Sequence, residues 1–132
     1  MKRIGDNMQT SQELCVLACL PSLDLQETEK FYRDYLGFEA AVYQDETTLI
    51  LKKGSIEIMF NATEDPAICQ ESQVYIRGIA ITSLYEDLKA KNWSNAPLAK
   101  LSEFTDRPWG MREFYIQDPH GNLLCFGHEI EE

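Results

Sequence analysis

The N-terminal half of the chain alternates between short apolar runs and one amphipathic segment. Leu14–Leu20 is a short apolar run that stops at a proline, which is typical of a buried strand. In residues 24–37, apolar side chains recur at helical spacing, Asp24 and Glu27 suit an N-terminal capping box, and Gly37 suits a left-handed C-terminal cap. Three extended runs follow, over residues 38–43, 48–52 and 55–60. This half is therefore predicted to contain a strand, a helix and three strands.

The same order of elements repeats in the C-terminal half. Residues 61–72 contain proline and several polar and acidic side chains, and they are predicted to form a linker. Val74–Ile81 is predicted to be a strand, and a helix is predicted to start at Ser83 with Glu86 completing its capping box. Three more strands are predicted over residues 98–103, 111–117 and 122–128, the last two joined by a DPHG turn.

The repeated order predicts an α+β fold built from two βαβββ units. We expect one domain over residues 14–130, with units over about 14–60 and 73–130, after a tail over residues 1–13. Each unit alone is too small to bury both faces of a four-stranded sheet and a helix. The two units are therefore expected to share a core and a curved mixed sheet.

Alternation along the predicted strands assigns side chains to two faces. The helix-facing set is Ile56, Ile58, Phe60, Phe114 and Ile116. The opposite face carries Glu57, Met59, Glu113 and Tyr115. A face that mixes polar and aromatic side chains suits a lined cleft better than a dry core.

Trp109 lies in a loop with proline and glycine, RPWGM, just before a predicted strand. Two interpretations fit this position: the ring plugs the edge of a core, or it forms one wall of a ligand site. The local pattern leaves both interpretations open.

The charge of the chain excludes one class of partner. Its 132 residues include 22 acidic and 12 basic side chains, which gives a net charge of −10. Nucleic acid is excluded as a partner because phosphate binding needs a basic face. An acidic protein attracts cationic ligands instead. No apolar run is long enough to span a bilayer, so we expect no membrane partner, and without a recognisable signal peptide we expect a cytoplasmic protein.

The four cysteines form no CxxC pair, and the chain is long enough to fold without a disulfide framework. We expect free thiols in a reducing cytoplasm. If Cys15 and Cys19 share one strand, they lie about 13 Å apart, too far to bind one metal ion. Because their neighbours are apolar, we expect Cys15, Cys19 and Cys125 to be mostly buried.

The paired βαβββ order and two motifs resemble a known superfamily. The motifs are FYRDYLGF at the end of the first predicted helix and WGMREFYIQDPHGNLLCFG near the C-terminus. Over about Leu14–Ile130 the chain resembles the vicinal oxygen chelate superfamily, also called glyoxalase/bleomycin resistance/dioxygenase. This fold hosts isomerases, dioxygenases, epimerases, thiol transferases and drug-binding proteins, so the resemblance implies a fold more strongly than an activity.

The resemblance also implies where a divalent metal would bind, but the donor set is incomplete. The positions that match the usual ligands are Leu17, Glu57, Gly78 and Cys125. Only Glu57 is a usual ligand, and a catalytic site normally needs three protein ligands. His120 lies in a turn and His128 has the opposite strand parity to Cys125, so neither replaces a missing ligand. We expect no metal and no other cofactor.

Metal-free members with this pattern are typified by the bleomycin-resistance proteins. These are homodimers that sequester a cationic drug in two interface clefts, where a Trp nine residues before the DP turn stacks on the drug. Trp109 lies nine residues before Asp118, which favours the ligand-wall interpretation. The resemblance therefore implies a homodimer that confers antibiotic resistance by sequestering a cationic or amphipathic small molecule. The expected ligand-binding residues are Glu57, Met59, Trp109, Glu113 and Tyr115.

Two departures keep other functions open. RPWGMREF replaces the more glycine-rich loop of the drug-binding members, so the sequence does not establish bleomycin as the ligand. The alternative is a lyase, isomerase or dioxygenase-type enzyme. In a lyase or isomerase, Glu57 would act as general base and Tyr115 or Arg112 as oxyanion partner. A third possibility is a scaffold subunit that uses the fold only to dimerise.

Overall fold

The computed structural model describes residues 14–131, and the predicted tail over residues 1–13 lies outside the described residues. The first unit contains β1 (Ala18–Ser22), α2 (Leu25–Asp34), β2 (Tyr43–Gln44), β3 (Thr48–Lys53) and β4 (Ile56–Ala62). A short helix, α3 (Pro66–Gln70), connects the two units. The second unit contains β5 (Gln73–Arg77), α4 (Ile81–Lys89), the 3-10 turn η1 (Trp93–Asn95), β6 (Lys100–Leu101), β7 (Thr105–Asp106), β8 (Met111–Gln117) and β9 (Leu123–Glu129).

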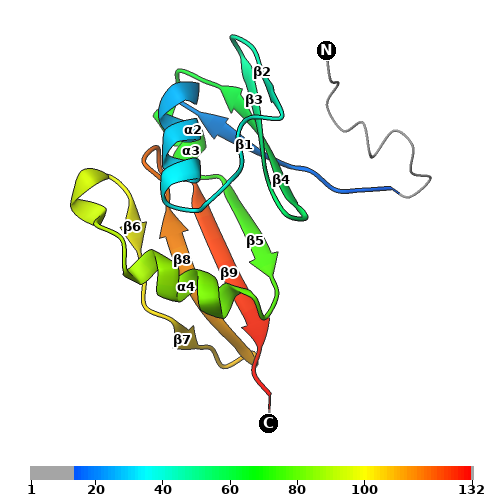
Figure 1. Ribbon diagram of the computed structural model, residues 1–132, viewed down its shortest axis with the longest axis vertical. Helices are drawn as coiled ribbons and strands as arrows, with labels where there is room; N and C mark the ends of the chain where they lie inside the picture. The colour runs from blue at the N-terminus through cyan, green and yellow to red at the C-terminus, as the bar shows by residue number, and fades with distance from the viewer. Residues whose placement is uncertain (1–13, 132) are drawn as a thin grey trace.

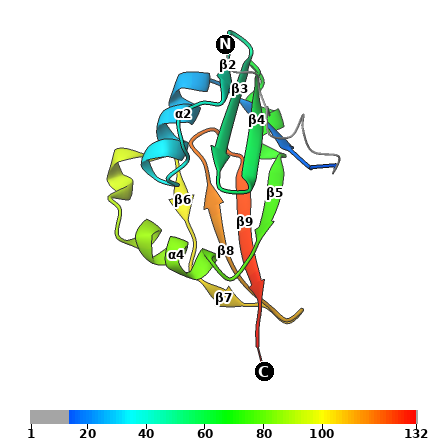
Figure 2. The same ribbon diagram turned by 45° about the vertical axis from the view of Figure 1, so that its right-hand side comes forward.

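The predicted α+β fold of two βαβββ units is confirmed. The expected shared sheet is wrong, because the strands pair only within each unit and form two mixed sheets. The first sheet has the order β1-β4-β3-β2, and the second has the order β5-β9-β8-β6, with β7 also paired to β8. The first strand of each unit runs parallel to the last strand. The two units follow one another along the long axis of the molecule (Figure 1), and Figure 2 shows α2 and α4 on the same side.

One apolar core lies between the helices and the two sheets. Of the predicted helix-facing residues, four are fully buried in this core and Ile56 packs against it partly buried; the four are Ile58, Phe60, Phe114 and Ile116. Phe114 and Phe126 stack with ring centroids 4.8 Å apart, which joins β8 to β9 on this face. Because side chains alternate along a strand, this packing directs the intervening residues to the outer faces of the sheets.

Helix α2 begins and ends with the predicted capping residues. The Asp24 carboxylate accepts hydrogen bonds from backbone N–H groups in the first turn, and Gly37 follows the helix in the left-handed region at φ 72°. The expected capping box is wrong, however, because the Asp24 N–H donates to Ser22 Oγ. Glu27 Oε2 instead lies 3.2 Å from His120 Nε2, so this side chain connects α2 to the DPHG turn of the second unit.

The predicted strand at Leu14–Leu20 differs from β1 at both ends. Pairing with β4 begins only at Ala18, and the apolar side chains of Leu14 and Val16 are exposed. The strand continues through Pro21, because β1 is an edge strand and a missing N–H on its free side costs no ladder bond. The expected burial of Cys15 and Cys19 is wrong. Cys15 precedes the strand, and Cys19 lies exposed on this edge strand.

The region predicted as a linker contains regular structure. Strand β4 continues to Ala62, and α3 begins after Asp65, whose side chain accepts a hydrogen bond from the Ala67 N–H. Pro66 occupies the first turn of the helix, where its lack of an N–H is harmless. The residues that suggested a loop are therefore the start signals of a short helix.

Helix α4 begins earlier than predicted. Strand β5 ends at Arg77, Gly78 follows with φ 153°, and the helix starts at Ile81. Ser83 lies inside the helix, where its hydroxyl donates to the Ala80 carbonyl instead of capping the first turn. Of the predicted strand over residues 98–103, only Lys100–Leu101 forms a strand, β6. Strand β7 lies beyond the predicted range, and both pair along the same edge of β8.

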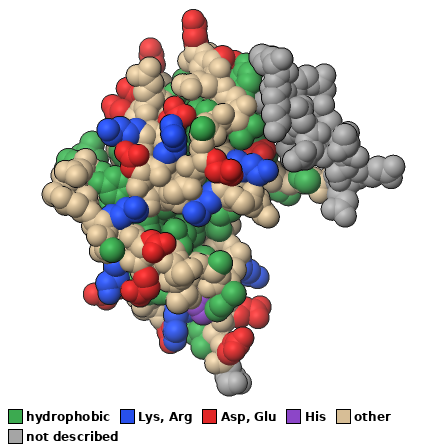
Figure 3. All heavy atoms as spheres, in the orientation of Figure 1, with side chains coloured by type: hydrophobic (Ala, Val, Ile, Leu, Met, Phe, Trp, Pro, Cys, Tyr) green, Lys and Arg blue, Asp and Glu red, His purple; other side chains and the backbone are tan. Residues whose placement is uncertain are grey.

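Charged side chains of both signs are interspersed over the two units on the face shown in Figure 3. No helix among residues 14–131 is long and apolar enough to cross a membrane.

Candidate ligand site

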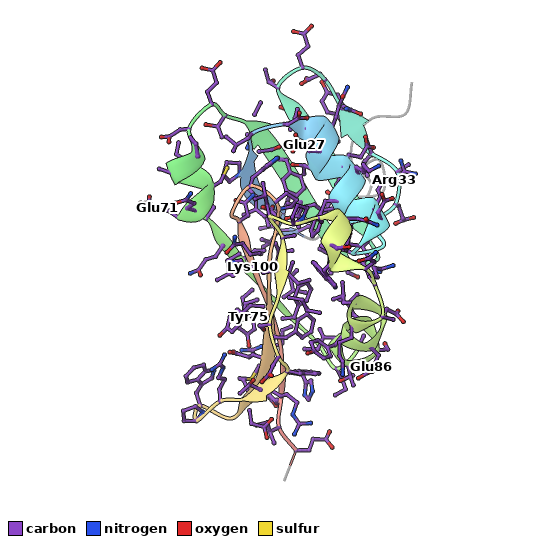
Figure 4. The ribbon with its side chains drawn as sticks, turned by 90° about the vertical axis from the view of Figure 1, so that its left-hand side faces the viewer. Glu27, Arg33, Glu71, Tyr75, Glu86 and Lys100 are labelled. Carbon is purple, nitrogen blue, oxygen red and sulfur yellow. The ribbon has the colours of Figure 1, made fainter. Side chains whose placement is uncertain are left out.

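An open cleft of about 500 Å³ lies on the outer face of the second sheet. Its lining residues are Gln73, Val74, Tyr75, Trp109, Glu113, Tyr115 and Cys125. Figure 4 shows Tyr75 on the side of this sheet that is opposite helix α4, which carries the labelled Glu86. The cleft is therefore separated from the apolar core by the strands themselves.

The Glu113 carboxylate lies at the base of the cleft with its side chain only 3% exposed. Its Oε2 atom accepts hydrogen bonds from the Tyr75 hydroxyl at 2.7 Å and from the Trp109 indole N–H at 3.2 Å. Its Oε1 atom accepts from the Tyr115 hydroxyl at 3.0 Å, and Arg107 Nε lies 3.6 Å from the same oxygen. Three aromatic side chains and one guanidinium thus surround a single buried carboxylate.

These contacts set the protonation states of the cluster. Burial acts to raise the pKa of Glu113, but the hydrogen bonds from Tyr75, Trp109 and Tyr115 and the charge of Arg107 hold this pKa below its ordinary value. Burial and the bond to the carboxylate raise the pKa of both tyrosines. At neutral pH the carboxylate is therefore charged and each tyrosine is a hydrogen-bond donor.

Gly127 allows Tyr75 to reach the carboxylate. Tyr75 extends from β5, Glu113 lies on β8, and β9 runs between these two strands. Gly127 is paired with Glu113 across β8 and β9. A Cβ atom at this glycine would overlap the Tyr75 hydroxyl, so only a residue without a side chain leaves the path across β9 open.

Trp109 lies at the rim of the cleft and is 63% exposed, so the core-plug interpretation is wrong. The tight turn that carries it is closed by a hydrogen bond from the Gly110 N–H to the Arg107 carbonyl, with Gly110 at φ 84°. The Arg107 guanidinium lies 5.3 Å from the centroid of the Tyr115 ring. The first and third residues of this turn, Arg107 and Trp109, therefore both contact the Glu113 cluster.

The structure brings together three of the five predicted site residues. Trp109, Glu113 and Tyr115 line one cleft, whereas Glu57 and Met59 lie on β4 of the first sheet and are not part of its lining. Glu57 Oε2 is buried and has no hydrogen-bond partner among residues 14–131.

Sequence reasoning missed three contributors to the cluster: Tyr75, Arg107 and Gly127. The alternation of VYIR would have assigned Tyr75 to the outer face, since Val74 and Ile76 pack against the core. The other two contributions depend on the pairing of distant strands.

The donor set does not fit a divalent metal at the positions that the superfamily resemblance implies. Leu17 and Gly78 have no side-chain donor atom. Cys125 is buried, as expected, and burial together with the nearby Glu113 charge raises the pKa of its thiol to about 11, so it is protonated at neutral pH. Within residues 14–131, no group of three or more His, Cys, Asp or Glu side chains is arranged to hold a metal ion.

The fold and the site define an α+β protein of two βαβββ units with an aromatic cleft on the outer face of one sheet. The chain belongs to the Glyoxalase/Bleomycin resistance protein/Dioxygenase superfamily, whose family model matches residues 16–126. This membership confirms the family that the sequence motifs resembled.

Relatives and solved structures agree with this assignment. The chain is 28% identical to the bleomycin resistance protein of Geobacillus stearothermophilus over 134 aligned positions, covering 87% of this chain and 96% of the relative. A bleomycin resistance protein of Staphylococcus aureus gives the same values.

Among solved structures, the bleomycin-binding protein of bleomycin-producing Streptomyces verticillus, complexed with copper(II)-bleomycin, has a TM-score of 0.75 at 22% identity, covering 92% of this chain and 100% of that chain. The bleomycin resistance determinant encoded on transposon Tn5 has a TM-score of 0.72 at 26% identity, covering 90% of this chain and 100% of that chain.

Proposed function

We propose that this protein sequesters a cationic or amphipathic small molecule in the cleft of the second sheet, without a metal ion. The observation that carries the proposal is the exposed Trp109 ring, which the bond to Glu113 holds at the rim of an aromatic cleft. A large ring held at the surface offers a stacking platform for flat or cationic groups. The net charge of −10 favours cationic ligands at long range.

The relatives support bleomycin as the first compound to test. The chain aligns along nearly the whole length of proteins named for bleomycin resistance. Drug resistance by sequestration needs no chemical step, only tight binding of the drug. We further propose that the protein acts in the cytoplasm, because all four cysteines are free thiols.

The same proposal includes a homodimer. The cleft of the second sheet is open, and Leu14 and Val16 expose apolar side chains that a second copy would cover. A partner chain would also provide a role for Glu57 and Met59, by bringing the outer face of a first sheet over the cleft of a second sheet. Sedimentation equilibrium at micromolar concentration is expected to give twice the chain mass, and a monomer mass would contradict this part of the proposal.

The enzyme alternative finds less support in the geometry. Its expected oxyanion partners do not converge: the Tyr115 hydroxyl donates to Glu113, while Arg112 lies on the opposite face of β8 and bonds Asp106. Neither group is free to assist a reaction started by Glu57.

Isothermal titration calorimetry with bleomycin, with and without copper(II), tests the proposal. We expect saturable binding with about one site per chain. Metal-free protein should bind as well as protein incubated with divalent metal, since the site uses no metal ion. No saturable heat with either form of the drug would contradict bleomycin sequestration.

A further inference from the structure

We propose that Glu113 is a positioning residue and not a ligand contact: it fixes the rings of Tyr75, Trp109 and Tyr115 in one arrangement, and the ring faces meet the ligand. The positioning role of Glu113 follows from the contacts of the cluster, and the effect of Glu113 on ligand binding rests on the proposed function. With Glu113 in this role, the cleft suits ligands with flat unsaturated rings and not ligands held by an ion pair to this carboxylate.

The carboxylate has no room for a ligand cation. Its side chain is 3% exposed, and both oxygens accept hydrogen bonds from within the chain. Its charge is opposed by Arg107, which lies 3.6 Å away. To reach an oxygen, a ligand ammonium group would have to displace a tyrosine or indole donor and lose its hydration shell. This costs more free energy than the resulting ion pair would contribute.

The rings of Tyr75 and Trp109, by contrast, remain accessible. Each is held at its polar end by the carboxylate, while Tyr75 is 43% exposed and Trp109 is 63% exposed. Tyr75 comes from β5 and Trp109 from the turn before β8, so one carboxylate fixes side chains of separate elements. Rings that are fixed before binding lose little freedom when a ligand stacks on them.

The position of Gly127 also supports a positioning role for Glu113. The hydroxyl of Tyr75 occupies the space of the missing side chain, so the second sheet is built to let this ring cross β9. A site that needed Glu113 as a free anion would leave its oxygens open and would not require this passage.

Glu113→Gln is the direct test, because it keeps the shape of the side chain and replaces one acceptor oxygen with an amide donor. The readout that needs no ligand is the indole N–H signal in a proton–nitrogen correlation spectrum of the whole chain. The sequence has two tryptophans, and the Trp93 indole donates to the Leu88 carbonyl at 2.9 Å, away from the cleft. We expect Glu113→Gln to move the Trp109 signal and to leave the Trp93 signal in place.

Binding of bleomycin is the second readout. We expect Glu113→Gln to weaken binding about tenfold, because the rings are no longer held together. The salt dependence of the affinity should be the same in Glu113→Gln as in the wild type, because screening of the net charge acts alike on both and the carboxylate makes no ion pair with the ligand. The matched control is Glu86→Gln, which removes the same charge from the exposed face of α4 and should leave both readouts unchanged.

Other results would overturn the inference. An unmoved Trp109 signal in Glu113→Gln, with bleomycin binding that is lost or that depends much less on salt than in the wild type, would make Glu113 an ionic ligand contact. If Glu113→Gln fails to fold, Tyr75→Phe decides, because Tyr75 and Trp109 share Oε2 and loss of one donor must shift the other. If the wild type binds no bleomycin, the proposed drug fails, while the indole signals still decide whether Glu113 positions the rings.

Discussion

The two units share one order of elements, but their outer faces differ in chemistry. A row of paired residues crosses the three main strands of each sheet. In the first sheet this row consists of Cys19, Met59 and Ile50. In the second sheet a row consists of Tyr75, Cys125 and Tyr115. Along this row the first face carries sulfur and aliphatic groups, with Glu57 on the same face, and the second carries phenols that donate to a buried carboxylate.

This difference shows which parts of the repeat serve the fold and which serve a site. The inward faces of both sheets contribute to one apolar core, so packing constrains them alike. The outward faces are free of that constraint, and only the second has gained a cluster of convergent polar atoms around Glu113. A repeated fold can therefore place a ligand site in one unit without changing the scaffold of either.

The largest expected effect comes from the inward face of the second unit. Phe114 is fully buried and stacks on Phe126, so Phe114→Ala should lower the free energy of unfolding by about 3 to 5 kcal/mol. Urea melts followed by circular dichroism measure this loss. A change below about 1 kcal/mol would mean that the core does not depend on this stack.

A second expected difference separates cysteines on the two outer faces. Cys19 is exposed on the first sheet, whereas Cys125 is buried and burial raises its pKa to about 11. At pH 8 a thiol with this pKa is about a hundredfold less ionised than one with an ordinary pKa near 9.

Thiol labelling of the native protein, followed by peptide mapping, should therefore modify Cys15 and Cys19 first and Cys125 far more slowly. A Cys19→Ser protein should lose one rapid phase of labelling. Equal rates for Cys19 and Cys125 would contradict the difference between the faces.

A third comparison concerns ligand binding. Trp109→Ala should weaken bleomycin binding by about 1 to 3 kcal/mol, the range for loss of a stacking anchor, with little change in stability because the ring is exposed. Met59→Ala should have a smaller effect, since a thioether on the first sheet makes weaker contacts. Trp93→Phe is the matched control, because Trp93 packs against Phe31 away from the cleft.

The affinities of these variants show whether the first sheet contributes to ligand binding. An affinity equal to wild type in Met59→Ala would restrict the site to the second sheet. A collapse of the unfolding midpoint in Trp109→Ala would contradict its placement at the rim.

Much of the fold was predictable from the sequence because its signals are local. Alternation assigned Glu113 and Tyr115 to the outer face, and Asp24 and Gly37 marked the ends of α2. Local signals failed where tertiary pairing decides, as at Pro21, which an edge strand tolerates although a proline normally ends a strand.

The Glu113 cluster itself was beyond such reasoning. Tyr75 meets Glu113 only because β5 and β9 pair in parallel in a register that places Tyr75 beside Cys125, and because Gly127 lies between the strands. These contacts join residues 38 positions apart in the chain, and no periodic pattern encodes a register between distant strands. The sequence indicated a polar and aromatic face, whereas the structure identifies which carboxylate organises it.

The smallest expected effect is the pH dependence of stability that the Glu113 cluster adds to the second unit. The pKa of Glu113 in the folded protein lies below its ordinary value, so the folded state binds its proton less readily than the unfolded state. This contribution is fully present above the ordinary glutamate pKa of about 4.3 and is lost as pH falls through the folded pKa. The free energy of unfolding of the wild type should therefore fall more steeply than that of Glu113→Gln below about pH 4.5.

The tyrosines of the cluster make stability depend on pH in the opposite direction, at alkaline pH. The pKa of Tyr75 is raised in the folded protein, so its contribution is fully present below the ordinary tyrosine pKa of about 10 and is lost as pH rises further. Tyr75→Phe removes this loss and should flatten the alkaline limb relative to the wild type. Urea melts at fixed ionic strength from pH 3 to pH 11, with Glu86→Gln as the matched charge control, measure both limbs. Parallel curves for the wild type and Glu113→Gln on the acid side would mean that the cluster does not hold a charged carboxylate, and the contrast between the two outer faces would then rest on the aromatic rings alone.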